Sequence, residues 1–336
     1  MMTILKKVAA MLATVAILCT SITGTVFAAN VQPAQAPVAV GEVRAVWVSF
    51  FDWQTYLKGK NQTDFTNAFS AMCDKILEQG CNTMIVHVRS HNDAVYPSAV
   101  YPWSTMMLNG NPGYDPLSIM VSTAHAKGLQ FHAWINPYGY RNGAFSGDPA
   151  LVTQNNIVAG VTEIVNNYAV DGIHFDDYFP PFGASVHNSM ISQVYTATHA
   201  AGKVFGISPQ GNIENNRAMG ADIDTWLSVP GYIDYICPQI YWTDNYGASG
   251  GVKMYSNRLA QWKAINKLGI PMYAGLAAYR CGQPIGADPG WVLSNTNLKS
   301  QANIAAANGY QGYFLYSYAS LSNASAQTEL MNLRSR

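Results

Sequence analysis

An eightfold alternation of two residue patterns, running from residue 42 to the C-terminus, leaves few folds open to this chain. Short runs rich in Val, Ile and aromatic residues, typical of buried strands, are each followed by a longer stretch with helical periodicity. The expected strands are residues 43–49, 83–89, 130–136, 172–177, 204–208, 232–241, 272–277 and 312–318. Eight successive βα units in one domain predict an α/β fold, a single (β/α)8 TIM barrel.

Residues that start and stop helices support this division. Five glycines stand just before expected strands, where helices should end: Gly80, Gly128, Gly202, Gly269 and Gly309. Two Asp-Pro pairs are typical of helix starts: Asp115-Pro116 and Asp148-Pro149. The main alternative, a doubly wound open sheet, would have a glycine-rich phosphate turn after its first strand. The segment Ser49–Trp53 contains no glycine, so we favour the closed barrel.

Residues 1–28 have the organisation of a secretory signal peptide. Two lysines precede an apolar run over residues 8–19, and about 12 apolar residues fall short of the ~20 that a membrane-spanning helix needs. We expect cleavage near Ala28 or Ala29 rather than retention as a membrane anchor. A linker over residues 29–41 and a barrel domain over residues 42–336 would follow. The predicted location is outside the cytoplasmic membrane, secreted or in the cell envelope, without stable membrane insertion.

Composition and cysteine spacing exclude several kinds of partner. With 49% hydrophobic residues the chain can build a large core, which excludes disorder. Lys+Arg and Asp+Glu both number 19, and loss of the two signal-peptide lysines leaves a slight acidic excess, so no strong field attracts nucleic acid. The four cysteines of the mature chain lack zinc-site spacing, and we expect no metal and no cofactor. A Cys237–Cys281 disulfide stays open, although free buried thiols are preferred for Cys73, Cys81, Cys237 and Cys281.

Polar side chains gather at the carboxyl ends of the expected strands, where a barrel builds its active face. Successive strand residues point to opposite sides, so one parity of each strand faces the barrel interior. The inward set is Ile85, His87, Arg89, His132, Trp134, Asn136, His174, Asp176, Cys237, Gln239 and Tyr241. The outward set, expected to pack against helices, is Val86, Val88, Ala133, Ile135, Ile173 and Phe175.

The composition of this face suits a sugar ligand, which needs flat apolar surfaces ringed by hydrogen-bonding groups. The rings expected at the mouth are Trp134, Tyr138, Tyr178, Tyr241, Trp242 and Tyr316. The polar substrate-binding candidates are His87, Arg89, His132, Asn136, His174 and Gln239. Each ring could also serve as core packing.

Two adjacent carboxylates end the expected fourth strand. Asp176 has the inward parity and would stabilise or attack a developing oxocarbenium ion, while a second group protonates the leaving oxygen. Asp177 points away by strict alternation, unless the following loop turns it inward. Other candidates for the second carboxyl are Asp93, Glu214 and Asp244, and the sequence does not choose among them. Either aspartate of the pair could instead cap a loop or form a structural ion pair.

Five segments in this order resemble the secreted bacterial glycosyl-hydrolase-like family ten: Val43–Ser49, Asp93–Ser98 with Pro102–Ser104, His132–Tyr138, Asp171–Pro180 and Pro238–Trp242. The resemblance covers essentially residue 42 to the C-terminus. It implies a TIM barrel of glycosidase type, with activity toward bacterial cell-wall or related glycans. The segment Asp171–Asp176 also resembles the fourth-strand signature of α-amylase-like barrels, which implies that Asp176 is the nucleophile. Chitinase-like barrels carry an acid two positions further on, where this chain has Tyr178.

Three functions therefore stay open. The first is a glycoside hydrolase that acts through Asp176 and a second acid on a polysaccharide or oligosaccharide. The second is a metal-dependent hydrolase, in which a cation would be held by His87, His132, His174, Asp176 and Asp177. The third is a barrel that binds a glycan without cleaving it.

Overall fold

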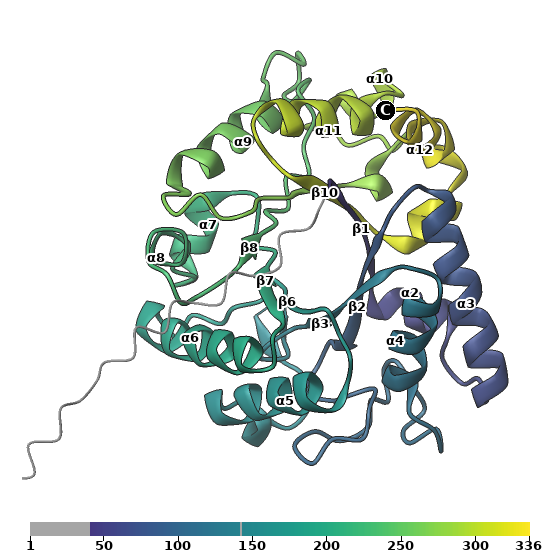
Figure 1. Ribbon diagram of the computed structural model, residues 1–336. Coiled ribbons are helices and arrows are strands. Elements are labelled where there is room, and N and C mark those ends of the chain that lie inside the picture. The colour runs from purple at the N-terminus through teal and green to yellow at the C-terminus, as the bar shows by residue number, and fades with distance from the viewer. Residues whose placement is uncertain (1–40, 142) are drawn as a thin grey trace, which may run out of the picture. The chain divides into compact units, whose positions relative to one another are not determined.

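The computed structural model describes residues 41–141 and 143–336. The predicted signal peptide (1–28) and nearly all of the predicted linker (29–41) lie outside the described residues. From residue 42 onward, parallel strands form an inner sheet that helices surround (Figure 1). The strands of this sheet are β1 (Val43–Val48), β2 (Thr83–Arg89), β3 (Gln130–Ile135), β6 (Gly172–Phe175), β7 (Val204–Ile207), β8 (Tyr235–Ile236), β9 (Ala274–Leu276) and β10 (Gly312–Tyr316).

Each strand of this sheet leads into one or more helical segments. The longer helices are α3 (Gln62–Glu78), α4 (Pro116–Ala126), α5 (Gln154–Asn167), α6 (Ala184–Ala200), α9 (Met254–Ile265), α11 (Asn297–Ala307) and α12 (Gln327–Arg334). Shorter elements are α2 (Phe50–Tyr56), α7 (Ile213–Ala218), α8 (Ile223–Trp226), α10 (Gly290–Leu293) and the hairpin β4 (Tyr140–Arg141) with β5 (Ala144–Phe145). Within the described ranges, no helix has both the length and the apolar character that crossing a membrane would require.

The sheet closes on itself. Hydrogen bonding orders the strands β8, β7, β6, β3, β2, β1, β10 and β9, all parallel. Two further parallel bridges, Ile236 with Met272 and Gln239 with Gly275, join the segments of β8 and β9. The predicted (β/α)8 TIM barrel is confirmed.

The alternation of side chains predicted for the strands is also confirmed, except at Arg89, which a register shift after His87 pairs with the outward-facing Ile135 and places against Tyr101. Two separate clusters of buried apolar residues exist. The cluster inside the barrel contains Ile85, Trp134 and Cys237 together with Trp47 and Tyr235. The cluster between strands and helices contains the outward set: Val86, Val88, Ala133, Ile135, Ile173 and Phe175. All four cysteines of this region are buried free thiols, as preferred from the sequence.

Local sequence explains where helices begin, with one correction. Asp115 caps α4 by accepting a hydrogen bond from the Ser118 amide at 3.1 Å, with Pro116 in the first turn, as predicted. Asp148 and Pro149, predicted to start a helix, start only the short 3-10 helix Pro149–Leu151 rather than α5. Asp148 accepts from the Ala150 amide in a short 3-10 turn, and α5 begins at Gln154 behind the side-chain cap Thr153.

Two aspartates fasten the amino-terminal ends of the strands. Asp171, just before β6, accepts hydrogen bonds from the Phe131 amide at 2.7 Å and from His125 at 2.9 Å. Asp234, just before β8, makes the same pair of contacts with the Phe205 amide at 2.7 Å and with a histidine in the last turn of α6 at 2.8 Å. Each carboxylate thus ties the start of its strand to the neighbouring strand and to the helix that precedes that neighbour.

The Asp171 and Asp234 side chains differ in burial, so we expect their removal to lower the free energy of unfolding by different amounts. Asp234→Ala should lower the free energy of unfolding by about 2–3 kcal/mol, because the Phe205 amide loses its buried acceptor. Asp171→Ala should cost about 1 kcal/mol, since that side chain is 33% exposed against 8% for Asp234 and water can replace it. Urea denaturation at neutral pH measures both. Equal losses would show that burial does not set the difference.

Candidate active site

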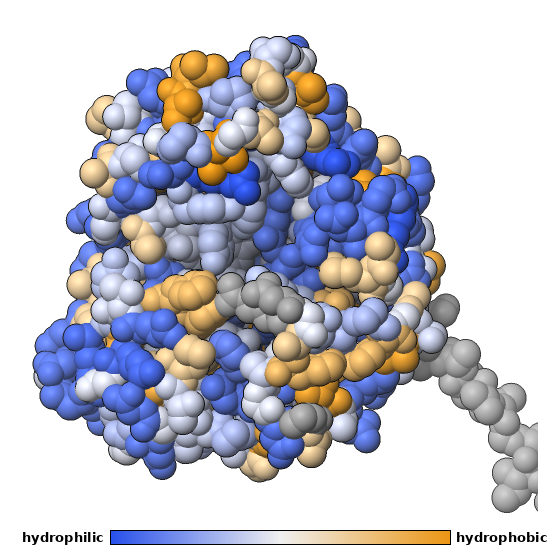
Figure 2. Space-filling view, turned by 180° about the vertical axis from the view of Figure 1, so that it is seen from behind, coloured by the Kyte–Doolittle hydropathy of each residue, from blue (hydrophilic) through white to orange (hydrophobic). Residues whose placement is uncertain are grey.

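The face at the carboxyl ends of the strands carries the candidate residues. Figure 2 shows the side of the molecule opposite to that in Figure 1, with a hollow near the middle of the surface and pale to orange residues beside it. Side chains from β2, β3 and β6 and from the segments after β8, β9 and β10 converge at this end of the barrel.

A hydrogen-bonded row of rings forms the floor of the barrel. The Tyr235 hydroxyl lies 2.9 Å from Nδ1 of both His132 and His174. The Trp47 indole donates to Nε2 of His174 at 3.2 Å, and the Ser208 hydroxyl lies 2.9 Å from the same nitrogen. Because an indole N–H can only donate, neutral His174 carries its proton on Nδ1 and donates to Tyr235. The Tyr235 hydroxyl then donates to His132.

This floor is electrically neutral. Burial lowers the pKa of His132 to about 4 and the pKa of His174 well below its ordinary value. Room for the rings comes from small strand residues: a Cβ on Gly206 would lie 2.2 Å from the Tyr235 ring. His132 and His174 were predicted to bind substrate, but His174 is fully buried and its ring nitrogens contact protein groups. These two histidines support the site from below.

The same contacts bear on the metal hypothesis. Two of its five predicted ligands, His132 and His174, share the hydroxyl of Tyr235. Across residues 41–141 and 143–336, no three His, Cys, Asp or Glu side chains gather in a metal-binding arrangement. The Tyr235 contacts favour the glycosidase hypothesis over the metal-dependent one.

Trp134 and His87 stack face to face next to this floor. Their ring centroids are 3.4 Å apart and the ring planes differ by 12°. The Phe50 amide donates to His87 Nδ1 at 3.1 Å. Trp134 is 3% exposed, and its indole N–H has no acceptor among the described residues. A buried donor of this kind gains a full hydrogen bond when a ligand oxygen reaches it.

Arg89 and Asn136, also predicted to bind substrate, make structural contacts instead, and Arg89 points to the helix side of the sheet. Arg89 is fully buried, donates from Nη2 to the Pro137 carbonyl at 2.7 Å, and places its guanidinium 3.8 Å from the centre of the Tyr101 ring. Asn136 is also buried and donates to the Tyr140 carbonyl at 3.1 Å. Both side chains hold the segments that follow β2 and β3.

Asp176 and Asp177 form a hydrogen-bonded carboxyl pair at the end of β6. The Asp176 amide continues the sheet by donating to the Ile135 carbonyl at 3.1 Å. The Asp177 amide donates to Asp176 Oδ1 at 2.8 Å, and the two side chains also share a hydrogen bond. Gln239 donates from Nε2 to the same Asp176 oxygen at 3.3 Å and to the Ser208 carbonyl at 3.0 Å. Because the strand ends at Phe175, the alternation of strand side chains does not extend to Asp177, which turns toward Asp176.

The two carboxyls of this pair differ in protonation. Burial and the adjacent charge of Asp176 raise the pKa of Asp177 well above its ordinary value. Like charges in contact cannot both ionise, so the pair holds one proton over a wide pH range. Asp177 therefore has the character of an acid, and Asp176 that of an anion.

Three tyrosines and an arginine border the site on the side of β8, β9 and β10. The Tyr241 ring lies 5.9 Å from the Tyr279 ring and 6.1 Å from the Tyr316 ring. Arg280 donates to the Tyr241 carbonyl at 3.0 Å and to the Tyr279 hydroxyl at 2.9 Å. Burial first, and then the neighbouring Tyr316 and Tyr279, raise the pKa of Tyr241 well above its ordinary value. Its hydroxyl stays protonated and can donate to a sugar oxygen.

The other predicted rings lie in different surroundings. Tyr138 is buried, and its hydroxyl is 2.8 Å from Nδ1 of His187, so it anchors α6 rather than lining the mouth. Tyr178 is half-buried directly after the carboxyl pair. Trp242 is half-buried after β8, and a Cβ on Gly211 would lie 2.7 Å from its ring, so that close approach fixes its position.

The other three carboxyl groups predicted as candidates for the second acid, Glu214, Asp244 and Asp93, lie in different surroundings. Glu214 is exposed on α7 and pairs with Arg217 at 2.7 Å, in a surface ion pair. Asp244 accepts from the Ser256 amide at 2.8 Å and so caps the start of α9. Asp93 is half-buried, burial raises its pKa, and its Oδ1 atom has no hydrogen-bond donor in the described part of the chain. Asp93 is therefore the one of these three that keeps the character of a catalytic candidate.

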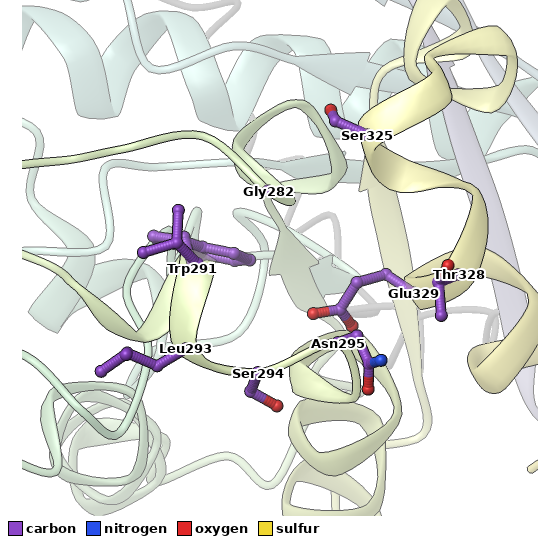
Figure 3. Close-up of a pocket in the computed structure, with 9 residues that line it drawn as sticks. Gly282, Trp291, Leu293, Ser294, Asn295, Ser325, Thr328 and Glu329 are labelled. Carbon is purple, nitrogen blue, oxygen red and sulfur yellow. The ribbon is translucent and has the colours of Figure 1, made fainter.

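A cavity of about 430 Å³ is lined by residues other than the carboxyl pair (Figure 3). It lies between the segment after β9, with Trp291 and Ser294, and the segment after β10, with Ser325 and Glu329. The Glu329 carboxylate accepts from the Leu298 amide at 2.9 Å and from Asn297 at 2.8 Å, so it fastens α11 to α12. None of the predicted site residues lines this cavity.

Sequence reasoning missed Tyr235, Ser208, Tyr279 and Arg280. Tyr235 has the same inward parity as Cys237 in the expected strand over residues 232–241. The alternation therefore predicts that Tyr235 points into the barrel. Tyr279 and Arg280 lie in a turn three and four residues after β9, where alternation no longer applies.

Comparison with known proteins agrees with the predicted family and fold. The family model "Glycosyl hydrolase-like 10" matches residues 42–146 and 188–293, more than half of the chain. The glycosyl hydrolase YngK of Bacillus subtilis is 28% identical over 74% of this chain, and the chain covers 63% of that protein's length. The glycosyl hydrolase DigH of Escherichia coli K12 is 28% identical over 92% of this chain and 90% of its own length.

Solved structures with the same fold have different activities. A chitinase from Chromobacterium violaceum superposes with a TM-score of 0.55 at 13% identity, over 88% of this chain and 100% of the chitinase. A xylanase-A-amylase inhibitor protein also gives a TM-score of 0.55, at 15% identity, over 87% of this chain and 99% of the inhibitor. These similarities show the barrel alone, and the site must carry the functional argument.

Proposed function

Because the chain belongs to the glycosyl hydrolase-like 10 family, we propose that it cleaves glycosidic bonds with the carboxyl pair Asp176 and Asp177. The observation that carries this proposal is geometric: two adjacent carboxyls end β6 at the mouth of the barrel, and the Asp177 amide and Gln239 both donate to Asp176 Oδ1, at 2.8 and 3.3 Å. Glycosidic cleavage needs a protonated and an ionised carboxyl in one site.

The two carboxyls take different roles. Asp176, fixed by Gln239 and by its own amide in the sheet, supplies the negative charge that stabilises the oxocarbenium-like transition state. Asp177 supplies the proton for the leaving oxygen, and a water molecule then bonds to the anomeric carbon and gives a proton back to the carboxyl pair. Hydrogen-bonded carboxyls lie closer together than the ~5–5.5 Å or ~6.5–9.5 Å of the usual glycosidase pairs, so these two act as one unit. If a separate carboxyl takes part, Asp93 is our candidate for it.

The surroundings of the pair support an uncharged sugar as ligand. Tyr241 and Tyr316 offer flat ring faces for C–H groups, and the Trp134 indole offers a buried donor without a partner. The neutral histidine floor adds no charge beneath the site. We propose a bacterial cell-wall or related polysaccharide as the substrate, and no nucleic acid partner.

The substrate can be tested with the purified domain, residues 29–336. We would incubate it separately with peptide-free peptidoglycan strands, chitin oligomers and α-glucans, and identify products by mass spectrometry. New reducing ends are expected from the peptidoglycan strands. Binding of a glycan without any new reducing end would support the non-catalytic alternative instead.

The proposed location has its own test. Residues 1–28 are proposed to direct export and to be removed. N-terminal sequencing of the protein recovered from the culture medium or cell envelope should begin at Ala29 or Asn30. Recovery of the chain with its original N-terminus would contradict the proposed cleavage.

A further inference from the structure

The exposed aromatic residues of the described chain share one face of the barrel. The large hydrophobic residues with high exposure include four aromatics: Phe51 (48%), Phe145 (39%), Phe182 (45%) and Tyr279 (38%). All four follow the carboxyl end of a strand: β1, β3, β6 and β9 respectively. Exposed rings gathered at one end of the molecule indicate a binding surface, since scattered exposure would need no explanation.

Phe145 and Phe182 form a stacked pair on this surface. Their ring centroids are 5.8 Å apart and their planes differ by 19°. Tyr138 supports Phe182 edge-on at 5.5 Å, and Tyr140 contacts Phe145 at 5.0 Å. The two phenylalanines come from different segments, the β4–β5 hairpin and the loop between β6 and α6.

The support beneath the pair is built in advance of any ligand. The Tyr138 hydroxyl is 2.8 Å from Nδ1 of His187, and Nε2 of His187 is 2.8 Å from the Pro180 carbonyl. Tyr138 and His187 are both buried. This chain of contacts fixes the loop that carries Phe182, so the exposed rings lose little further freedom when a flat ligand stacks on them.

The pair lies within reach of the carboxyl pair, but on another part of the rim. Phe182 follows Asp176 by six residues, so their Cα atoms are at most about 20 Å apart. The cluster of Tyr241, Tyr279 and Tyr316 follows β8, β9 and β10, whereas Phe145 and Phe182 follow β3 and β6. A chain that contacts both groups of rings must cross the mouth of the barrel.

We propose that Phe145 and Phe182 form a remote sugar subsite, on which a glycan chain stacks several units away from the bond that is cut. This inference rests on the proposed function. A glycan suits this surface because the rings are flat and uncharged and lie on the same face as the carboxyl pair. The substrate is then a polymer, and affinity depends on its length.

The test compares how the affinity for a glycan depends on its chain length. It uses the Asp176→Asn protein, in which binding is measured without turnover, and two variants made in that background. Affinity for peptide-free peptidoglycan oligosaccharides of increasing length is determined by calorimetry. Adding Phe145→Ala and Phe182→Ala should weaken binding of long chains about tenfold and leave the shortest bound chain unchanged. Adding Val292→Ala and Leu293→Ala, which removes two exposed apolar side chains from α10, should change neither.

Two further measurements separate the possible failures. Phe145→Tyr with Phe182→Tyr keeps the rings and should retain the length dependence, which guards against loss of folding. If wild type cleaves no glycan but the alanine pair still weakens long-chain binding, the subsite stands and the proposed function fails. If wild type cleaves glycans and the alanine pair leaves long-chain affinity unchanged, the subsite is wrong. Absence of any glycan binding would overturn both.

Discussion

Asp176→Asn should lower kcat by about 1,000-fold or more while leaving the fold and glycan affinity largely intact. The substituted amide keeps the size of the carboxyl group and can still accept the hydrogen bonds from the Asp177 amide and from Gln239. The substitution removes the negative charge that we propose lies beside the oxocarbenium-like transition state. Reducing-end release by the variant and wild type, measured on the same glycan, gives the ratio.

A matched control lies on the same strand. Asp171→Asn changes a carboxylate five residues earlier, at the amino end of β6, where it contacts the Phe131 amide and His125. We expect that variant to keep its turnover at a temperature where it is folded. Unchanged turnover in Asp176→Asn would remove Asp176 from the mechanism.

Asp177→Asn should lower kcat by about 100-fold or more and change the pH profile. The proposed proton donor must be protonated, and its pKa is raised by burial and by Asp176. Wild-type activity should therefore persist above the ordinary carboxyl range and fall as the pH rises through the pKa of Asp177. The variant lacks that proton at every pH, so its residual activity should lose this alkaline limb.

Stability gives an independent measure of the same proton. Asp177 binds its proton more tightly in the folded state than in the unfolded state, so wild-type stability is fully present below the unfolded pKa and falls as the pH rises toward the folded pKa. Asp177→Asn should flatten this decline in urea denaturation. A variant that retains the wild-type alkaline limb and the same pH dependence of stability would show that Asp177 does not hold the proton.

Much of the barrel was predictable because its strands repeat a simple pattern. Period-two alternation placed Trp134 inside and Ala133 outside, and this holds because each strand must fill the barrel on one side and contact helices on the other. The closure of the sheet follows from the same count of strands. The end of β6 was predicted two residues too late, and β8 was predicted far too long.

Beyond these strand ends, the sequence pattern no longer predicts where the site side chains point. Beyond Phe175 the chain leaves the sheet, so parity could not show that Asp177 turns back to Asp176. Parity predicts that Arg89 points inward, but this is wrong: a register shift between His87 and Arg89 pairs Arg89 with the outward-facing Ile135 and places its guanidinium against Tyr101. Tyr279 and Arg280 reach the mouth through a turn, whose geometry depends on packing rather than on local pattern.

The most direct test of the central claim is a crystal structure of Asp176→Asn with a peptide-free peptidoglycan oligosaccharide bound. We expect a glycosidic oxygen within hydrogen-bond distance of the Asp177 carboxyl, with one sugar ring against the tyrosine cluster of residues 241, 279 and 316. An oligosaccharide bound elsewhere on the barrel, with the side chains of residues 176 and 177 out of contact with any sugar, would contradict the central claim.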